Sequence, residues 1–166
     1  ILDARPNPAH LKLAELERAG KLSAVVTQNI DGLHQAAGSR QVYELHGSIL
    51  RNYCMDCHTF YDAEYVKNAE GIPRCEKCGG MIKPDVVLYE EGLDPATISG
   101  AVRAISEADM LIIGGTSLVV YPAAGFIDYF HGKYLVLINK SETARDVRAN
   151  LAIAAPIGSV MEKIRV

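Results

Sequence analysis

Four short apolar runs, each bounded by polar residues or glycine, have the pattern of buried strands. These predicted strands cover residues 24–27, 110–113, 134–138 and 151–154. Longer segments with helix-capping residues separate them along the chain. Strands that alternate with helices predict an α/β fold, here a Rossmann-like, mostly parallel sheet with helices on both faces.

Capping residues mark the ends of the predicted helices. Asn7 suits the N-cap of a helix that has Pro8 in its first turn and stops at Gly20. Other helices are predicted from Asp94 to about Ala108, from Pro122 to about Phe130, after Ser141 and from Ser159. A chain of 166 residues has room for one such domain and a small insertion.

Residues 47–83 differ in character from the rest of the chain. They contain all four cysteines and several charges, but few long apolar runs. Strand-like sequence resumes at Val86-Val87-Leu88-Tyr89. We therefore expect an inserted module at 47–83, with 1–46 and 84–166 together forming the Rossmann-like domain.

The four cysteines are spaced as two close pairs, Cys54 with Cys57 and Cys75 with Cys78. Each pair can bind a metal through two thiolates from one tight turn, and two such turns complete a tetrahedron. Four thiolates leave no open position, so the spacing predicts a structural zinc ion. Two disulfides or four free thiols are the alternative, and the run from Cys54 to His58 also fits the attachment motif of c-type haem.

Composition and charge exclude some classes of protein. Hydrophobic residues make up 49% and charged residues 22% of the chain, as in ordinary soluble globular proteins. Seventeen basic and 20 acidic residues give a net charge of -3, which argues against a general nucleic-acid binder. No apolar run is long enough to cross a membrane and no signal peptide is visible. We therefore expect a cytoplasmic protein, with reduced cysteines and no membrane partner.

Polar residues follow three of the predicted strands. Gln28, Asn29, Asp31 and His34 come after the first in loop-like sequence, residues 114–117 after the second and Asn139 after the third. Ligands of parallel sheets bind beyond the carboxyl ends of the strands, and polar side chains are costly to bury unpaired. We therefore expect these three strand ends to converge on a cofactor crevice. The first group could equally be a turn in which Asn and Asp mimic the backbone.

Two further features carry weaker signals. Histidine changes charge near neutral pH, so His46 in Leu45-His46-Gly47 could be a general base, although a packed histidine is the alternative. The run Gly114-Gly115-Thr116-Ser117 would let the backbone approach a phosphate, but the chain contains no G-x-G-x-x-G motif. Neither feature identifies a function by itself.

Together these motifs resemble the sirtuins, the NAD-dependent protein-lysine deacylases. The matching segments occur in the family's order and span nearly the whole chain. They are residues 4–10 (ARPNPAH), 27–34 (TQNIDGLH), 45–47 (LHG), the two cysteine pairs, 84–89 (PDVVLY), 115–118 (GTSL) and 138–139 (IN). No single segment is decisive, but so many in order leave little room for chance.

The resemblance implies a role for each matching residue. His46 would be the general base that activates a ribose hydroxyl after the acyl oxygen of lysine has attacked C1′ of the nicotinamide ribose. Asn29 and Asp31 would line the nicotinamide pocket as further catalytic residues, and Gln28 would contact the nicotinamide ribose. The remaining NAD contacts would come from Ile30, Gly115, Thr116, Ser117, Asn139, Lys140 and Ser141.

The resemblance also implies substrates, cofactors and partners. Val86, Val87, Leu88 and Tyr89 would pair with an acyl-lysine peptide as an added strand. The cofactors would be NAD and a structural zinc ion held by the four cysteines. The products would be nicotinamide, deacylated lysine and an O-acyl-ADP-ribose. We expect a monomer that makes no direct contact with nucleic acid.

Two departures from the family pattern matter. The family's glycine- and alanine-rich loop after the first strand, and the Arg-bearing segment that follows it, are not present, and the chain opens on Ile1. We therefore expect a truncated form that lacks deacylase activity by itself and does not reveal the acyl preference. Glu90 stands where the family more often has Gly, which could change the peptide-binding edge.

Two other functions fit the sequence. NAD-dependent ADP-ribosyl transfer is performed by some family members from the same site. Outside enzymes, the cysteine pairs could form a zinc-ribbon protein-binding module on an inactive scaffold. A nucleic-acid-binding ribbon is disfavoured, because the module is not strongly basic and its aromatic residues do not alternate with Lys or Arg.

Overall fold

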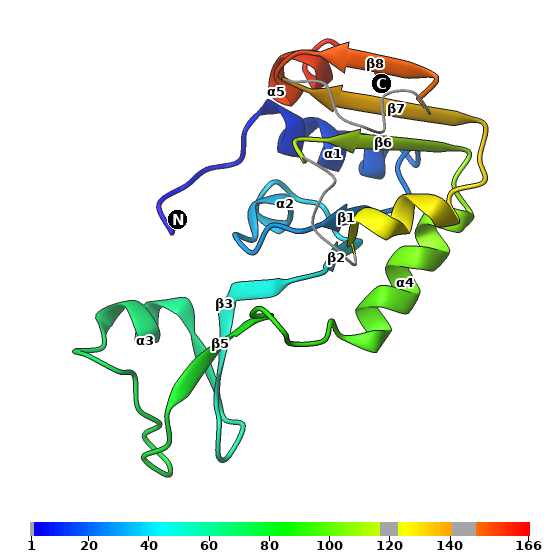
Figure 1. The fold of residues 1–166 in the computed structure, drawn as a ribbon. Helices are drawn as coiled ribbons and strands as arrows, with labels where there is room; N and C mark the ends of the chain where they lie inside the picture. The colour runs from blue at the N-terminus through cyan, green and yellow to red at the C-terminus, as the bar shows by residue number, and fades with distance from the viewer. Residues whose placement is uncertain (1, 117–122, 141–148) are drawn as a thin grey trace.

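The computed structural model describes residues 2–116, 123–140 and 149–166, and parallel strands form its larger part (Figure 1). β1 (Val25–Thr27) pairs in parallel with β2 (Val42–Glu44). A second parallel sheet contains β6 (Met110–Gly114), β7 (Tyr134–Asn139) and β8 (Leu151–Ala154) in that order. The predicted α/β fold with parallel strands is confirmed, and within the described ranges these strands pair as two sheets.

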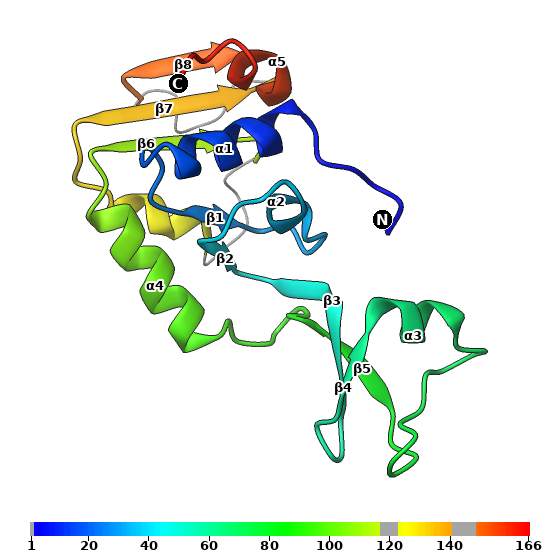
Figure 2. The ribbon, with the colours of Figure 1, turned by 180° about the vertical axis from the view of Figure 1, so that it is seen from behind.

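Helices lie on both sides of the parallel strands (Figure 2). On one side, α1 (Pro8–Arg18) packs against α5 (Ile157–Met161), and α5 also contacts β7. On the other side, α4 (Pro95–Ser106) packs against β2 and against η1 (Ala123–Tyr129), a 3-10 helix. The prediction of helices on both faces is therefore confirmed.

Two buried clusters fill the space between strands and helices. One joins Ile138 of β7 to Ala9 of α1 and Met161 of α5. The other is built on Leu45, Ala101, Ile105 and Phe126. Leu111 and Ile112, successive residues of β6, pack into different clusters because side chains alternate across a strand. The two faces of β6 are therefore covered by different clusters.

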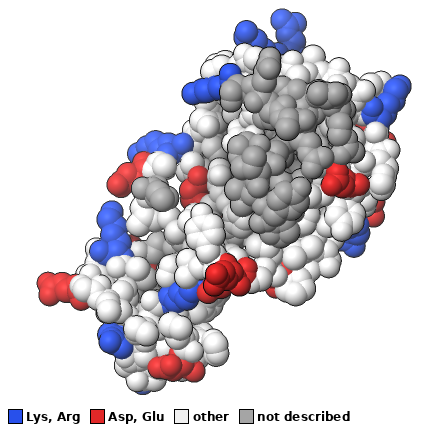
Figure 3. Space-filling model, in the orientation of Figure 1, with Lys and Arg blue, Asp and Glu red and all other residues white. Residues whose placement is uncertain are grey.

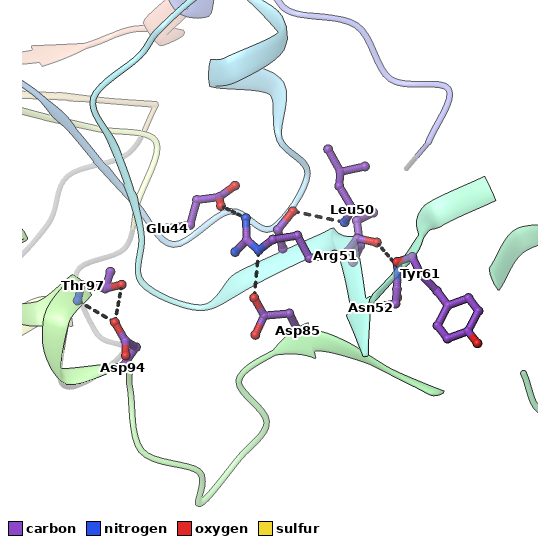
Figure 4. Close-up of polar contacts among 10 residues, drawn as sticks. Glu44, Leu50, Arg51, Asn52, Tyr61, Asp85, Asp94 and Thr97 are labelled. Carbon is purple, nitrogen blue, oxygen red and sulfur yellow. Dashed lines mark hydrogen bonds and ion pairs between the residues drawn. The ribbon is translucent and has the colours of Figure 1, made fainter. Parts of the chain in front are cut away.

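The helix starts follow the capping chemistry of the sequence. The Asn7 side chain accepts hydrogen bonds from the backbone amides of Ala9 and His10, at 2.9 and 3.2 Å. The His10 ring accepts in return from the Asn7 amide at 3.1 Å, which completes a capping box. Asp94 caps α4 by accepting from the Thr97 amide at 2.7 Å (Figure 4). Both predicted N-caps are confirmed.

A separate antiparallel sheet carries the cysteines. In it, β3 (Gly47–Cys54) lies between β4 (Phe60–Asp62) and β5 (Ile82–Val86). The helix α3 (Ala63–Asn68) follows β4, and both ribbon views show this group projecting from the parallel strands. The predicted module boundaries at 47 and 83 stay a prediction.

One predicted strand is displaced in the structure. The strand predicted at 86–89 lies instead at 82–86. It ends there because the chain turns back on itself, with the Glu91 amide donating to the Leu88 carbonyl at 3.1 Å. The helix predicted after Ser141 lies outside the described residues.

Three helical predictions also need correction. The last helix begins at Ile157, two residues before the predicted Ser159. The segment predicted as a helix at 122–130 is a 3-10 helix in its described part. His34, expected in a loop, lies in the short helix α2 (Leu33–Ala36).

The surface agrees with the mild net charge. Figure 3 shows basic and acidic side chains interspersed over the described part of one face. Among the helices of the described ranges, none combines the length and the apolar character needed to cross a membrane.

Candidate functional site

Four residues lie at the carboxyl ends of four parallel strands. Gln28 follows β1, His46 follows β2 by two residues, Thr116 follows β6 and Asn139 ends β7. We call these four residues the strand-end cluster. Hydrogen bonds link all four, so the two parallel sheets meet at the edge where such folds bind ligands.

Asn139 and Thr116 hold each other through two hydrogen bonds. The Asn139 side chain accepts from the Thr116 amide at 3.2 Å and donates to the Thr116 carbonyl at 2.9 Å. The Thr116 hydroxyl donates to Oε1 of Gln28 at 3.2 Å, between residues 88 positions apart in the sequence. The structure thus brings three of the predicted NAD-binding residues together. Their contact with NAD stays a prediction.

His46 is held by its ring and by its backbone. Nδ1 of the ring lies 3.1 Å from the carbonyl oxygen of Gln28. A carbonyl oxygen only accepts, so Nδ1 carries the hydrogen, and in the neutral ring the lone pair is on Nε2. The His46 carbonyl accepts from the Val87 amide at 3.1 Å. The half-buried imidazole is therefore fixed in a tautomer whose Nε2 can take up a proton.

Gly47, the residue after His46, has to be a glycine. Its φ of 76° lies in the left-handed region, where a side chain is strained. A Cβ at this position would lie 1.9 Å from the backbone oxygen of Asp85. Any other residue would therefore push β5 away from the histidine.

Side-chain hydrogen bonds shape the loop that follows β1. The Thr27 hydroxyl accepts from the Asn29 amide at 3.1 Å. Asp31 accepts from the Leu33 amide at 3.0 Å at the start of α2, so it acts as the turn-forming residue that the sequence allowed. Asp31 is half-buried and Asn29 is exposed. Their place in a nicotinamide pocket stays a prediction.

The glycine loop after β6 presents its backbone to solvent. Gly115 is exposed, with a left-handed φ of 66°, and its amide donates to the Ile138 carbonyl at 3.2 Å. Lys140, another predicted NAD contact, is exposed. Ser117 and Ser141 were also predicted to bind NAD, and both lie outside the described residues.

The segment predicted to bind peptide begins at the end of β5 and passes beside His46. The Val87 amide donates to the His46 carbonyl, and the next two side chains, Leu88 and Tyr89, are exposed. Glu90 then takes a left-handed φ of 71°, which a residue other than glycine rarely adopts. Peptide binding by this segment stays a prediction.

The four cysteine sulfurs all lie within 4.8 Å of one another, and we call this group the cysteine cluster. Cys54 Sγ is 3.4 Å from Cys78 Sγ, and Cys57 Sγ is 3.5 Å from Cys75 Sγ. Four thiolates around zinc, at about 2.3 Å each, place their sulfurs about 3.8 Å apart. All four are free thiols, so they form no disulfide. Both pairs share one site, which fits zinc and leaves the haem motif unsupported.

The two turns that carry the cysteines repeat one geometry. The His58 amide donates to the Cys54 carbonyl at 3.0 Å, and the Gly79 amide donates to the Cys75 carbonyl at 2.8 Å. His58 and Gly79 both have left-handed backbones, with φ of 56° and 77°. A Cβ on Gly80 would lie 2.8 Å from the Cys54 sulfur, so glycine leaves space for this ligand.

Hydrogen bonds distribute the protons of the cysteine cluster unevenly. The Tyr61 hydroxyl donates to Cys75 Sγ at 3.2 Å, and this bond lowers the pKa of Cys75 to about 6. At Cys78 the Gly80 amide favours the thiolate, but hydrogen bonds with the neighbouring thiols outweigh it and raise the pKa to about 12. Adjacent thiolates repel one another, so a divalent cation is what lets all four ionise together.

Arg51 makes two ion pairs that the sequence did not predict (Figure 4). It donates to Glu44 at 2.7 Å and to Asp85 at 2.9 Å. These partners lie seven and 34 residues away, so no local spacing indicates either pair. They stand near the ends of β2 and β5, two positions before His46 and two before Val87, whose amide bonds to His46.

Sequence comparisons agree with this arrangement. A family model described as "Sir2 family" matches residues 1–122. A relative from Clostridium perfringens (strain 13 / Type A), named NAD-dependent protein deacetylase, is 64% identical over 163 residues, covering 98% of this chain and 67% of the relative. A relative of the same name from Clostridium acetobutylicum is 66% identical over 163 residues, with 98% and 66% covered. The chain thus spans about two thirds of the length of these relatives.

Solved structures agree as well. A structure described as "Sir2-p53 peptide-NAD+" is similar with a TM-score of 0.91 and 39% identity, covering 98% of this chain and 70% of that one. Another, "Sir2 bound to acetylated peptide", has a TM-score of 0.90 and 38% identity, with 98% and 70% covered. The similarity extends over both the parallel strands and the antiparallel sheet, since nearly the whole chain is matched.

Proposed function

The chain belongs to the Sir2 family, and on this premise we propose that its strand-end cluster is part of the NAD site of an NAD-dependent protein-lysine deacylase. The observation that carries the proposal is the hydrogen-bonded set of Gln28, His46, Thr116 and Asn139 at the ends of four parallel strands. The names of the relatives, and the NAD+ and acetylated peptide in the descriptions of similar structures, support the same reaction.

His46 is the proposed general base. When bound, NAD supplies an ADP-ribosyl group to accept the acyl group, with nicotinamide as the leaving group. His46 takes a proton at Nε2 from a ribose hydroxyl after the acyl oxygen has attacked C1′. The Gln28 carbonyl, which accepts from Nδ1, stabilises the positive charge that the ring then carries. The negative charge of Asp31 would stabilise the positive charge that develops on the ribose as nicotinamide leaves.

The residues proposed to hold NAD suit a polar dinucleotide. Gly115 exposes a backbone that a phosphate can approach closely. Thr116 and Asn139 brace each other and present their side chains at the strand ends. The proposed set is completed by Gln28, Asn29, Ile30, Asp31, Ser117, Lys140 and Ser141.

An acyl-lysine peptide is the proposed substrate. Val86 to Tyr89 would offer backbone groups for an added strand, with Leu88 and Tyr89 supplying exposed apolar surface. The Val87 amide already bonds to the His46 carbonyl, so a peptide on this segment would lie next to the base.

Zinc would have a structural role in this protein. Four thiolates fill a tetrahedral coordination sphere and leave no position for a reacting water. Cys54 and Cys75 also belong to the small buried core of the antiparallel sheet, with Tyr61 and Ile82. Zinc would therefore fix the shape of this sheet and take no part in breaking bonds.

The remaining features of the proposal concern organisation and location. Residues 47–83 would form the zinc-binding module, and 1–46 with 84–166 the NAD-binding domain. Reduced thiols suit the cytoplasm. The net charge of -3 supports a protein that binds no nucleic acid directly, and we propose a monomer that can be checked by its mass in solution.

The 166-residue chain is proposed to lack deacylase activity alone. The test joins it to the remaining third of the Clostridium perfringens relative, which gives a form of full family length that we call the completed protein. We expect NAD-dependent deacylation from the completed protein only. Deacylation by the 166-residue chain itself would contradict this expectation.

A nicotinamide-release assay on the completed protein tests the proposed function. We expect release that requires acetylated peptide and that yields one deacetylated peptide for each nicotinamide. Release without acetylated peptide, with label from NAD transferred to protein, would indicate ADP-ribosyl transfer instead. No release under either condition would leave the zinc-ribbon binding module on an inactive scaffold as the better account.

A further inference from the structure

Arg51 of β3 lies between Glu44 and Asp85 (Figure 4). These two residues belong to chain segments that meet at His46. Its Nη1 donates to Glu44 at 2.7 Å, and its Nε donates to Asp85 at 2.9 Å. Glu44 is the last residue of β2, two positions before His46. Asp85 is two positions before Val87, whose amide donates to the His46 carbonyl. One guanidinium therefore ties together both segments that hold the histidine backbone.

The pairing of β3 with β5 is irregular where Arg51 lies. Ser48 is paired with Asp85, but the next pair along the ladder joins Asn52 to Pro84. Three residues of β3, Arg51 among them, are thus inserted between neighbouring pairs. The Arg51–Asp85 ion pair links the two strands at this point, where the regular ladder is interrupted.

The same irregularity brings β3 to the loop that follows β1. The Ile49 amide donates to the carbonyl of Ile30, at 3.0 Å, next to Asp31. The Asn52 side chain donates to the Ile49 carbonyl at 3.3 Å and supports this path. Neither bond involves the Arg51 side chain, so the proposed nicotinamide loop should keep its place when Arg51 is substituted.

The two carboxylates differ in how strongly they need Arg51. The Glu44 side chain is only 9% exposed, whereas that of Asp85 is 47% exposed. A buried carboxylate is costly without a cation, so Glu44 depends on Arg51. The Asp85 pair is screened by solvent, so it should add little stability and serve mainly to fix the positions of the two strands. A planar guanidinium can bind both partners at fixed angles, which a lysine ammonium cannot.

We propose that Arg51 is a positioning residue for the reaction, acting through His46 and through the peptide-binding segment that follows Asp85. This inference rests on the proposed function. The guanidinium holds the end of β2 and the end of β5 at a fixed separation, which keeps His46 aligned with the ribose hydroxyl and the acyl-lysine. A displacement of about 1 Å can lower a rate about 100-fold.

The test compares Arg51→Met and Arg51→Lys with the wild type in the completed protein. Two rates are measured at saturating NAD: deacetylation of an acetylated peptide and exchange of labelled nicotinamide into NAD. Exchange needs the nicotinamide–ribose bond to break and re-form, whereas deacetylation also needs the base. We expect Arg51→Met to lower kcat for deacetylation about 10- to 100-fold and to raise the KM for peptide. The rate of exchange at saturating peptide should change much less. The kcat of Arg51→Lys for deacetylation should lie between those of the wild type and Arg51→Met.

Replacing Glu44 in the Arg51→Met background separates positioning from folding. Glu44→Gln removes the unpaired buried charge, so the melting temperature should recover while kcat for deacetylation stays low. The control is Lys12→Met, which breaks the Lys12–Glu15 ion pair on α1 and should leave both rates unchanged. Recovery of deacetylation with the melting temperature would overturn the inference, as would a parallel fall of exchange and deacetylation in Arg51→Met.

The imidazole ¹⁵N resonances of His46 test the inference without relying on activity. In the wild type we expect a protonated Nδ1 and an unprotonated Nε2. In Arg51→Met we expect a mixture of the two tautomers or a changed rate of interconversion between them. An inactive wild type would contradict the proposed function. The resonances alone would then decide whether Arg51 positions His46. Resonances that are the same in both forms would show that Arg51 does not position the histidine.

Discussion

The cysteine cluster and the strand-end cluster are assembled in different ways. Each half of the cysteine cluster is one tight turn, with a hydrogen bond from the fifth residue back to the first. The strand-end cluster instead depends on hydrogen bonds between residues 18, 23 and 88 positions apart. The first is visible in local spacing, whereas the second appears only once the parallel strands are aligned. The proposed metal site can therefore be disturbed separately from the proposed chemistry.

Zinc removal should have the largest effect, because it should unfold the region of the cysteine cluster and leave the strand-end cluster folded. We expect a chelator to unfold the antiparallel sheet, because zinc binding at four thiolates is worth on the order of 10 kcal/mol and two ligands belong to that sheet's core. Hydrogen exchange should show lost protection in β3 and β5 and retained protection in β6 and β7. Cys54→Ala should behave like the chelated protein and respond no further to chelator. A Cys54→Ala protein that melts like the wild type would show that the metal is not structural.

Asn139→Ala should weaken the strand-end cluster and leave the cysteine cluster intact. It removes both hydrogen bonds to Thr116, which should lower the free energy of unfolding by about 1–3 kcal/mol and weaken NAD binding. Urea unfolding and calorimetric NAD titration of the completed protein measure the two effects.

The matched control for this variant is Asn150→Ala. Asn150 accepts from the Leu135 amide at 2.7 Å, at the other end of β7. Its loss should reduce stability by a comparable amount but leave NAD affinity unchanged. Equal NAD affinity in all three proteins would exclude Asn139 from the NAD site.

Acid should destabilise the parallel-strand region through His10 and His34. Their rings are 4.7 Å apart, and burial lowers the pKa of both below 6.5. For His34 the proximity of His10 adds to this effect, while Asp31 and Glu44 oppose it. Below about pH 6.5 the unfolded chain therefore binds more protons at these two histidines than the folded chain does. This stabilisation is complete above the unfolded pKa of 6.5 and declines as the pH falls below it.

The measurement is urea unfolding of the wild type and of His34→Phe at about pH 7.5 and about pH 5.5. We expect the free energy of unfolding to fall more in the wild type than in the variant between these two pH values. Loss of zinc in acid affects both proteins alike, so the difference isolates the histidines. His131→Gln, at an exposed histidine, is the control and should follow the wild type. An identical pH dependence in wild type and His34→Phe would refute this account.

The smallest effect is expected at Glu90, in the turn that leads from β5 back to the parallel strands. Its left-handed φ of 71° costs a residue with a side chain about 1 kcal/mol, which Glu90→Gly should recover. Thermal unfolding should show a small rise in melting temperature. Glu107→Gly, at a φ of -88°, has no such strain to relieve and should give no rise. A decrease for Glu90→Gly would mean that the Glu90 side chain itself stabilises the turn.

The sequence predicted those parts of the fold that depend on local chemistry. Asn7 and Asp94 cap helices where they were expected to, because an N-cap needs only a few neighbouring residues. The end of β5 was misplaced because it depends on a turn closed by Glu91, which accepts from the Leu88 amide at 2.9 Å. Apolar, β-branched sequence alone gave no sign of that turn.

The sequence also predicted one part of the candidate site and missed another. Gln28, Thr116 and Asn139 were expected to converge because each follows or ends a parallel strand, and the structure brings them together. Arg51 was missed because both of its partners are distant in sequence and because an exposed arginine on a strand is common. Long-range ion pairs of this kind leave no periodic signal.

The central claim is that the chemistry takes place at His46 and not at the zinc ion. Deacetylation by the completed protein, measured side by side for the wild type and His46→Ala at equal zinc content, tests it most directly. We expect a loss of deacetylation of about 100- to 10,000-fold in His46→Ala, with a melting temperature lowered only slightly by the loss of the hydrogen bond to Gln28. Equal deacetylation rates in the two proteins would contradict it.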